Sequence, residues 1–227
     1  MYEGIADEKN RMFVLSSSNP NKRKTVQTGA IEEYIFCNIC DNEILSSYER
    51  YAANHFYNLD FRGENVNFRQ IVNEHGIGLI QCENIDYANF KIFLLSLLWR
   101  ASITTNPLFQ NFKLPQAIEE ELRIAILNND PLTELEFPCL LFTHQNNEQV
   151  ATDLVFVKAI QDDKAIFYIN QFIYTFYLNK MTIDPIIHIT ALNKQGRMAV
   201  VKAPHGTWTK IRKSVFAGLA EVGNKKI

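Results

Sequence analysis

The sequence lacks the features that would assign a function at once. Its formal net charge is −2 at pH 7, so there is no global basic field of the kind that attracts nucleic acid. It also lacks the short motifs of phosphate-binding loops, dinucleotide-binding folds, serine hydrolases and zinc proteases. The residues therefore define no reaction. We expect a protein that is not an enzyme; if it is one, the reaction class would be that of a metal-dependent nuclease.

Long apolar runs are absent as well. The most apolar stretch, residues 92–99, is bracketed by Lys91 and Arg100, and it is far shorter than the roughly 20 residues that span a bilayer. The first ten residues are polar and acidic, unlike the apolar centre of a secretory signal. We therefore expect no membrane partner and a cytoplasmic location, where a close pair of cysteines indicates a metal or redox site rather than a structural disulfide.

Apolar residues are plentiful: 47% of the chain is hydrophobic, which is enough for a substantial core. Helix-type spacing and capping residues predict three helices, over residues 84–104, 115–128 and 207–222. Asn84 is the expected N-cap of the first, and Arg100 near its end has Glu49 as a candidate partner. Segments rich in β-branched and aromatic residues predict strands at 77–81, 137–143, 154–160, 165–178 and 198–203. His188 is expected in a further apolar strand.

Cys37 and Cys40 are the only close pair among the four cysteines, and they have the spacing of a zinc knuckle. A structural zinc needs four ligands, so two thiolates require completion. Within the chain, Cys82 with His55 or His75 would complete the site. Alternatively, a second copy would donate its own pair across a twofold axis, or another protein would supply the missing half.

A metal-free pair packed as small hydrophobic side chains is the remaining alternative for these cysteines. A redox role is disfavoured, because no thioredoxin-like βαβ pattern precedes the pair. After the pair, Ile44, Tyr48, Ala52 and His55 recur at helical spacing, which predicts an amphipathic helix with His55 on its apolar face.

Basic residues gather in two places despite the balanced charge. One is a short run near the N-terminus and the other lies on the polar face of the predicted last helix. A phosphate-binding surface of the protein would use Lys22, Arg23, Lys24, Lys210, Arg212 and Lys213.

Several stretches, in order, resemble one group of proteins. They are Asp7 to Met12, Gln27-Thr28-Gly29, the Cys37–Cys40 pair with Asp41, Tyr48-Glu49-x-Tyr51, and Leu97 to Ser102. Together they are similar to uncharacterised bacterial proteins related to HNH endonucleases. In that family a first C-x-x-C and the second pair jointly hold a structural zinc, and a histidine between them is catalytic. Only the second pair has a counterpart here, followed by Asp41 where the family has Glu, and no residue matches the catalytic histidine.

From the predicted elements together with this resemblance, we expect an α+β fold in three parts that share one continuous core. Residues 1–60 would form a degenerate treble-clef or HNH-like part, residues 61–130 a central helical part, and residues 131–227 an antiparallel sheet closed by a helix. The implied function is a non-catalytic HNH-like protein that binds nucleic acid or a protein partner, in bacterial defence or prophage biology. The alternatives are a nuclease subunit completed in trans by a partner chain, and a purely structural or interaction protein.

Overall fold

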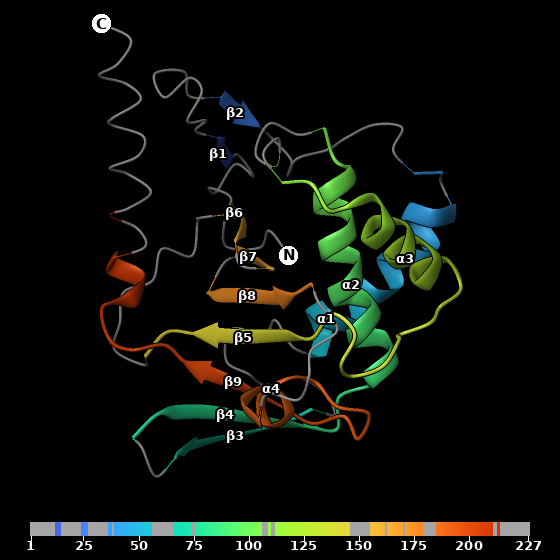
Figure 1. Cartoon of the computed structure of the whole chain (residues 1–227). Helices are drawn as coiled ribbons and strands as arrows, with labels where there is room; N and C mark the ends of the chain where they lie inside the picture. Colours follow the sequence, from blue (N-terminus) through green and yellow to red (C-terminus); the bar gives the residue numbers. More distant parts are fainter. Residues whose placement is uncertain are drawn as a thin grey trace, which may run out of the picture.

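The chain folds into a mixed α/β structure in which three helices lie together beside a seven-stranded sheet (Figure 1). The computed structural model describes residues 12–14, 24–26, 36–37, 39–55, 66–73, 76–105, 109, 112–145, 155–161, 163–169, 171–178, 185–210 and 213. The helical elements are η1 (Cys40–Leu45, a π-helix), α1 (Ser46–His55), α2 (Tyr87–Ile103), α3 (Gln116–Leu127) and α4 (Pro185–Thr190).

Two short strands, β1 (Met12–Val14) and β2 (Lys24–Val26), form a separate antiparallel pair. The large sheet has the order β3-β4-β9-β5-β8-β7-β6. Its strands are β3 (Asn67–Val72), β4 (Gly78–Glu83), β5 (Cys139–Thr143), β6 (Val155–Gln161), β7 (Lys164–Ile169), β8 (Phe172–Tyr177) and β9 (Met198–Lys202).

The sheet is mixed, which corrects the expectation of an antiparallel one. The strand β9 enters between β4 and β5, pairing antiparallel with β4 and parallel with β5, where Leu141 lies opposite Val200. Parallel neighbours need a crossover connection, and α4 lies in the connection that leads back to β9. The predicted segment 165–178 covers two strands, β7 and β8, which pair antiparallel.

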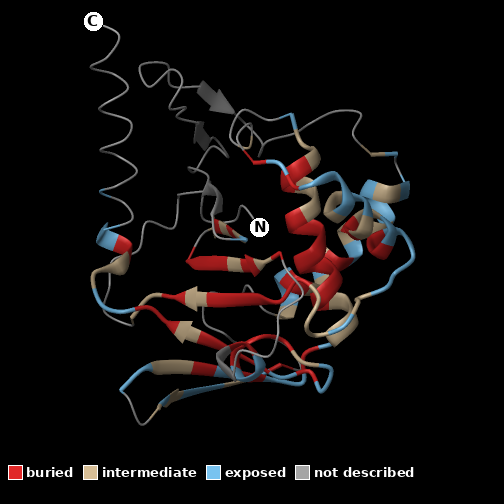
Figure 2. Ribbon diagram, in the orientation of Figure 1, coloured by how far each residue is buried: buried red, intermediate tan, exposed pale blue. Residues whose placement is uncertain are grey.

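The helix α2 is buried over most of its length (Figure 2). It packs against α1 and α3 and belongs to the main hydrophobic cluster that includes the sheet, as expected for a helix that is apolar nearly all round. Its start differs from the prediction: the N-cap is Asp86, whose carboxylate accepts a hydrogen bond from the Asn89 N–H at 3.0 Å. Asn84 lies outside the helix with φ 63°.

The strand β5 shows how the two faces of the sheet are covered. Cys139 and Leu141 point into the main core, whereas Leu140, which alternates with them, packs with Ile187 of α4 in a second cluster. Side chains on a strand alternate between faces, so α4 covers the other side of β5. His188 is exposed on α4, which corrects its predicted place in a strand.

The main cluster of buried side chains includes Leu45, Phe93 and Leu141, one from each of the three predicted parts of the chain. The boundaries 1–60, 61–130 and 131–227 stay predictions. Of the predicted last helix, residues 207–210 and 213 are described, and they are helical, with Trp208 buried. Within the described residues, no helix has both the length and the apolar character needed to cross a membrane.

Candidate functional sites

The cysteine pair lies at the start of a continuous helical segment formed by η1 and α1. Cys37 is exposed and Cys40 is half-buried. The backbone N–H of Cys40 donates to Cys37 Sγ at 3.3 Å, and the N–H of Asp41 donates to the Cys37 carbonyl oxygen at 3.0 Å. Cys37 thus accepts hydrogen bonds from two N–H groups of the first turn of this helical segment. Its exposure contradicts the alternative in which both cysteines are packed as small hydrophobic side chains.

The two thiols are electrostatically unequal. A side-chain hydrogen bond from Cys40, helped by the Cys40 backbone N–H, lowers the pKa of Cys37 below its ordinary value. The same contact raises the pKa of Cys40. A thiolate at a helix N-terminus is stabilised in this way, so Cys37 is favoured over Cys40 as the thiolate of the pair.

The structure does not bring the predicted zinc ligands together. Cys82 is fully buried in β4, where burial raises its pKa to about 12. His55 ends α1, stacked on the ring of Tyr51 with centroids 4.4 Å apart. The rise of a helix places His55 about 20 Å from Cys40. Among the described residues, no three His, Cys, Asp or Glu side chains are grouped so as to hold a metal ion.

The described part of the chain therefore contains no complete set of ligands for a structural zinc. A zinc shared by the Cys37–Cys40 pairs of two copies stays a prediction, as does completion by a partner protein. His75, the alternative ligand, lies outside the described residues.

Of the six basic residues predicted to bind nucleic acid, Lys22, Arg23 and Arg212 lie outside the described residues. Lys24 is the first residue of β2. Lys210 and Lys213 are exposed. The structure therefore does not bring the two predicted basic runs into one described surface, and their role stays a prediction.

Three polar contacts fix α1 to the rest of the molecule. The Tyr48 hydroxyl donates to Asn129 Oδ1 at 2.6 Å. Arg100 Nη1 bonds Glu49 Oε1 at 2.6 Å, which confirms the partner predicted for Arg100. Together with Tyr51, whose hydroxyl accepts the Asp86 N–H at 2.7 Å, these contacts set the position of the cysteine pair at the other end of the same helical segment.

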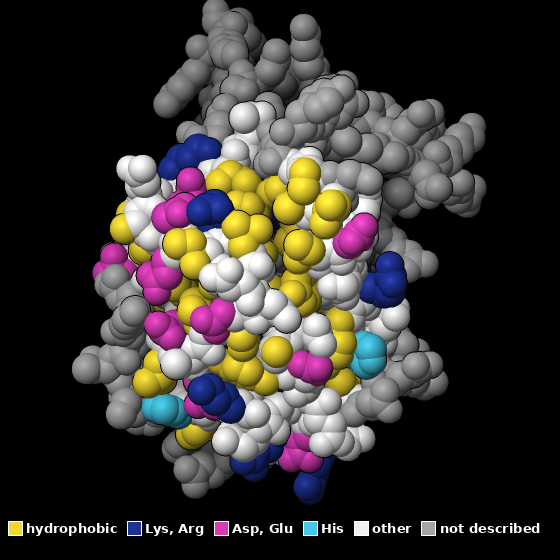
Figure 3. Space-filling view, turned by 90° about the vertical axis from the view of Figure 1, so that its right-hand side faces the viewer, with side chains coloured by type: hydrophobic (Ala, Val, Ile, Leu, Met, Phe, Trp, Pro, Cys, Tyr) yellow, Lys and Arg dark blue, Asp and Glu magenta, His cyan; other side chains and the backbone are white. Residues whose placement is uncertain are grey.

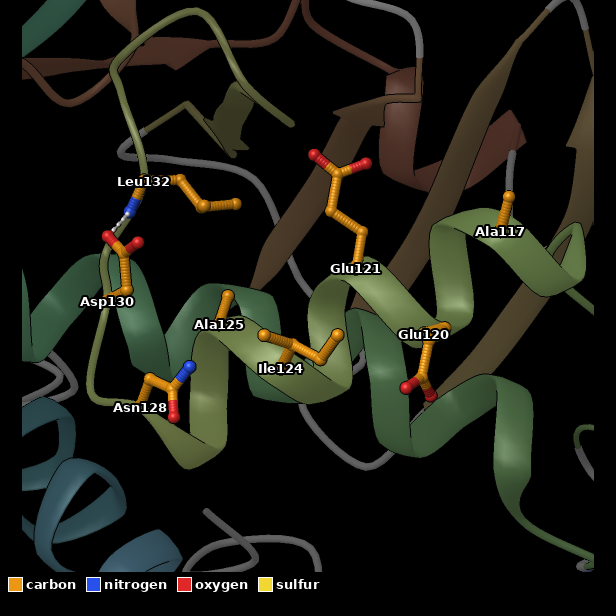
Figure 4. Close-up of a pocket in the computed structure, with 8 residues that line it drawn as sticks. All are labelled: Ala117, Glu120, Glu121, Ile124, Ala125, Asn128, Asp130 and Leu132. Carbon is orange, nitrogen blue, oxygen red and sulfur yellow. Dashed lines mark hydrogen bonds between the residues drawn. The ribbon is translucent and has the colours of Figure 1, made fainter.

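Sequence reasoning missed an open hollow of about 370 Å³ along α3 (Figure 4). Its lining consists of α3 side chains and of the loop that follows the helix. The lining residues are Ala117, Glu120, Glu121, Ile124, Ala125, Asn128, Asp130 and Leu132. Figure 3 shows this side of the molecule, where hydrophobic side chains are exposed with acidic ones dispersed among them.

The hollow is lined by both apolar and acidic side chains. Ile124 is 45% exposed although it is large and apolar. Glu120 is held by two hydrogen bonds of 2.7 Å from Arg123, which lower the pKa of Glu120. Asp130 accepts the Leu132 N–H at 2.9 Å and so fixes the loop beside the helix. The run of glutamates early in α3, next to an apolar residue outside its buried face, was the available sequence signal.

Comparison with protein-family models, with curated proteins and with solved structures gives no match. The class that the fold defines is therefore a mixed α/β protein with a seven-stranded mixed sheet. The resemblance to HNH-related proteins stays a hypothesis based on the sequence motifs.

Proposed function

We propose that the chain is a non-catalytic binding protein, and that the hollow on α3 takes a segment of a protein partner carrying lysine or arginine beside apolar side chains. The observation that carries this proposal is the combination of apolar and acidic side chains in the lining of one open hollow. Interfaces typically have an apolar centre with a polar rim.

The apolar part supplies the surface that a partner would cover. Ile124 and Leu127 of α3 are 45% and 47% exposed. They are neighbours on the helix, three residues apart. Ile124 lines the hollow, and Leu132 lines it from the loop that follows the helix (Figure 4). Removing such side chains from water stabilises a complex by about 25 cal/mol per Å² of apolar surface buried.

The acidic residues in the lining of the hollow favour a partner of opposite charge. Glu121 and Asp130 line the hollow, together with Glu120, whose carboxylate is paired with Arg123. Carboxylates attract ammonium and guanidinium groups and repel phosphates, and like charges facing each other across an interface are unfavourable. The hollow therefore favours a basic protein segment over the backbone of a nucleic acid.

The test uses a labelled amphipathic helical peptide of leucine and arginine, and a matched peptide of leucine and glutamate. Fluorescence anisotropy with the full chain should show binding of the first peptide alone, weakened by salt. Ile124→Ser should weaken it about tenfold, as expected for an apolar contact at the centre of an interface. Glu121→Gln should weaken it and reduce its dependence on salt.

The matched control is Glu83→Gln, at an exposed position of β4 away from the hollow, which should leave binding unchanged. Equal binding of the two peptides would contradict the proposal. So would equal loss of binding in Glu83→Gln and Glu121→Gln.

Nucleic-acid binding is the second candidate, supported by the exposure of Lys210 and Lys213 three residues apart in the last helical segment. A labelled duplex DNA in the same assay tests it. Binding that falls steeply with salt, and weakens when both lysines are replaced by glutamate, would favour this function over the peptide-binding one.

For the N-terminal part, we infer descent from an HNH-like protein, with the degenerate treble clef as the finer fold hypothesis. The supporting feature is a C-x-x-C that leads directly into a helix anchored on the core, as the sequence resemblance implies. This ancestry gives no reason to expect nuclease activity, because no residue of the sequence corresponds to the catalytic histidine.

A further inference from the structure

The Cys37–Cys40 pair differs from the other two cysteines in being open to reagents. Cys37 is exposed and Cys40 half-buried, whereas Cys82 and Cys139 are 0% and 3% exposed. A side-chain hydrogen bond joins the thiols of Cys37 and Cys40, so the two sulfur atoms lie next to each other. The surface thus presents two neighbouring thiols that a reagent can reach.

The position of the pair distinguishes its two members. Cys37 precedes the continuous helical segment of η1 and α1, and its Sγ accepts the Cys40 N–H at 3.3 Å. Backbone N–H groups and the positive end of the helix dipole favour a thiolate there. On the other side, the ring of Phe36 packs on Trp99 of α2 with centroids 5.4 Å apart. The Cys40 N–H on one side and the Phe36–Trp99 ring contact on the other therefore fix the position of Cys37, while the residue stays exposed.

We propose that Cys37 and Cys40 form a thiol–disulfide exchange site whose substrate is the disulfide of a small thiol compound. The inference is independent of the hollow on α3. It revises the expectation from the sequence, which disfavoured a redox role because no βαβ pattern precedes the pair. The start of a long helical segment provides the local setting that such a site requires, whatever sheet the helix packs on.

The exchange proceeds in two displacements. The Cys37 thiolate attacks one sulfur of the small disulfide, so that a mixed disulfide forms, the original S–S bond breaks, and the first small thiolate leaves and takes up a proton. Cys40 then loses its proton and attacks Cys37 Sγ, which releases the second small thiolate. The protein dithiol is oxidised by two electrons to a disulfide, and the small disulfide is reduced to two thiols.

The test uses the reduced full chain, freed of metal by a chelator and desalted, with oxidised glutathione as the probe. Mass spectrometry after alkylation should find Cys37 linked to Cys40, with Cys82 and Cys139 still reduced. The exposed pair should react at least about tenfold faster than the buried cysteines. Cys40→Ser should stop at the first step and accumulate one glutathione on Cys37.

Cys37→Ser is the matched variant, and it should take up glutathione at least about tenfold more slowly at Cys40. Circular dichroism of both variants checks that the fold is kept; should either be unfolded, the wild-type rates of the four cysteines decide. Equal uptake by the two variants, or equal reactivity of all four cysteines, would overturn the proposal. So would tight binding of zinc by the pair at one ion for two chains, which would make it a shared metal site.

Discussion

The neighbouring helices α2 and α3 use their side chains in opposite ways. In α2, consecutive residues from Phe90 to Leu98 are buried. In α3, Leu122, Ala125 and Ile126 are buried, whereas Ile124 and Leu127 are about half exposed. The first helix is a structural centre that other elements surround, and the second covers it with one face while offering the other to solvent. The comparison separates residues that determine stability from residues available for binding.

The largest expected effect is that of Phe93→Ala in α2. Phe93 is fully buried, with its ring 5.8 Å from that of Phe90, so the variant should lose about 3–5 kcal/mol of unfolding free energy. Ile124→Ala in α3 should lose less than about 1 kcal/mol, because its side chain is already half in water. Urea unfolding measures both changes. Equal losses of unfolding free energy would show that the side chains of Phe93 and Ile124 contribute equally to stability, which would contradict the comparison.

Domains of this kind have only about 5–15 kcal/mol of stability, so a loss at the upper end of the expected range would leave too little folded Phe93→Ala protein to measure. Phe93→Leu is then the milder substitution, and it should still lose more stability than Ile124→Ala.

A second prediction concerns the polar joint between the two helices. Ser102 of α2 is fully buried; its hydroxyl donates to Glu119 Oε2 at 2.5 Å and accepts the Leu114 N–H at 3.0 Å. Ser102→Ala should cost about 1–3 kcal/mol, because it leaves the buried Leu114 N–H without that partner. The matched control is Ser96→Ala in the same helix, whose hydroxyl donates only to the Phe93 carbonyl of its own turn.

Ser96→Ala should change the unfolding free energy by less than about 0.5 kcal/mol, because that carbonyl lies inside the helix and keeps its backbone bond. Thermal unfolding of the two serine variants checks the pair. If Ser96→Ala lowers the unfolding free energy as much as Ser102→Ala, the loss of a buried hydroxyl alone explains both values. The contacts of Ser102 with Glu119 and Leu114 would then add nothing to stability.

The positions of α2 and α3 could be predicted from the sequence because local patterns determine them: an apolar run for one, and proline followed by glutamates for the other. The predicted start of α2 at Asn84 was wrong, because a contact with a residue far away in the sequence determines where the helix begins. The Ile85 N–H donates to the Gly196 carbonyl at 3.0 Å, and this interaction holds the chain away from helical geometry before Asp86. The parallel pairing of β5 with β9 depends in the same way on residues far apart in the sequence.

In the candidate sites too, local sequence patterns predict some features, whereas contacts between distant residues determine others. Spacing alone identified the Cys37–Cys40 pair, but it could not tell that Cys82 is buried inside the sheet. His55 was predicted as a ligand, and that prediction was wrong because the helical rise between Cys40 and His55 separates them. The hollow on α3 depends on a loop in which Asn129 and Leu132 have φ 54° and 60°, values that L-residues adopt rarely and that no local pattern predicts.

The third prediction concerns the one charged residue among the buried positions of α2. Lys91 is 2% exposed, and its Nζ donates to the carbonyl oxygens of Glu136 at 2.7 Å and Phe137 at 3.2 Å. Burial lowers its pKa from 10.5 to about 8, partly opposed by nearby Cys139 and by acidic residues, Glu136 and Glu134. Between these two pH values the unfolded chain binds more protons than the folded one, so the Lys91 contribution to stability increases as the pH rises.

We therefore expect the unfolding free energy of the wild type, relative to Lys91→Met, to rise between pH 8 and pH 10 by up to about 1.4 kcal/mol per pH unit. Urea unfolding at several pH values measures this difference, in which the titration of other groups largely cancels. Lys194→Met, at an exposed position, is the control and should give a constant difference. A constant difference for Lys91→Met as well would mean that the buried ammonium keeps its proton throughout, and that its two carbonyl partners offset the cost of burying it in an otherwise apolar helix.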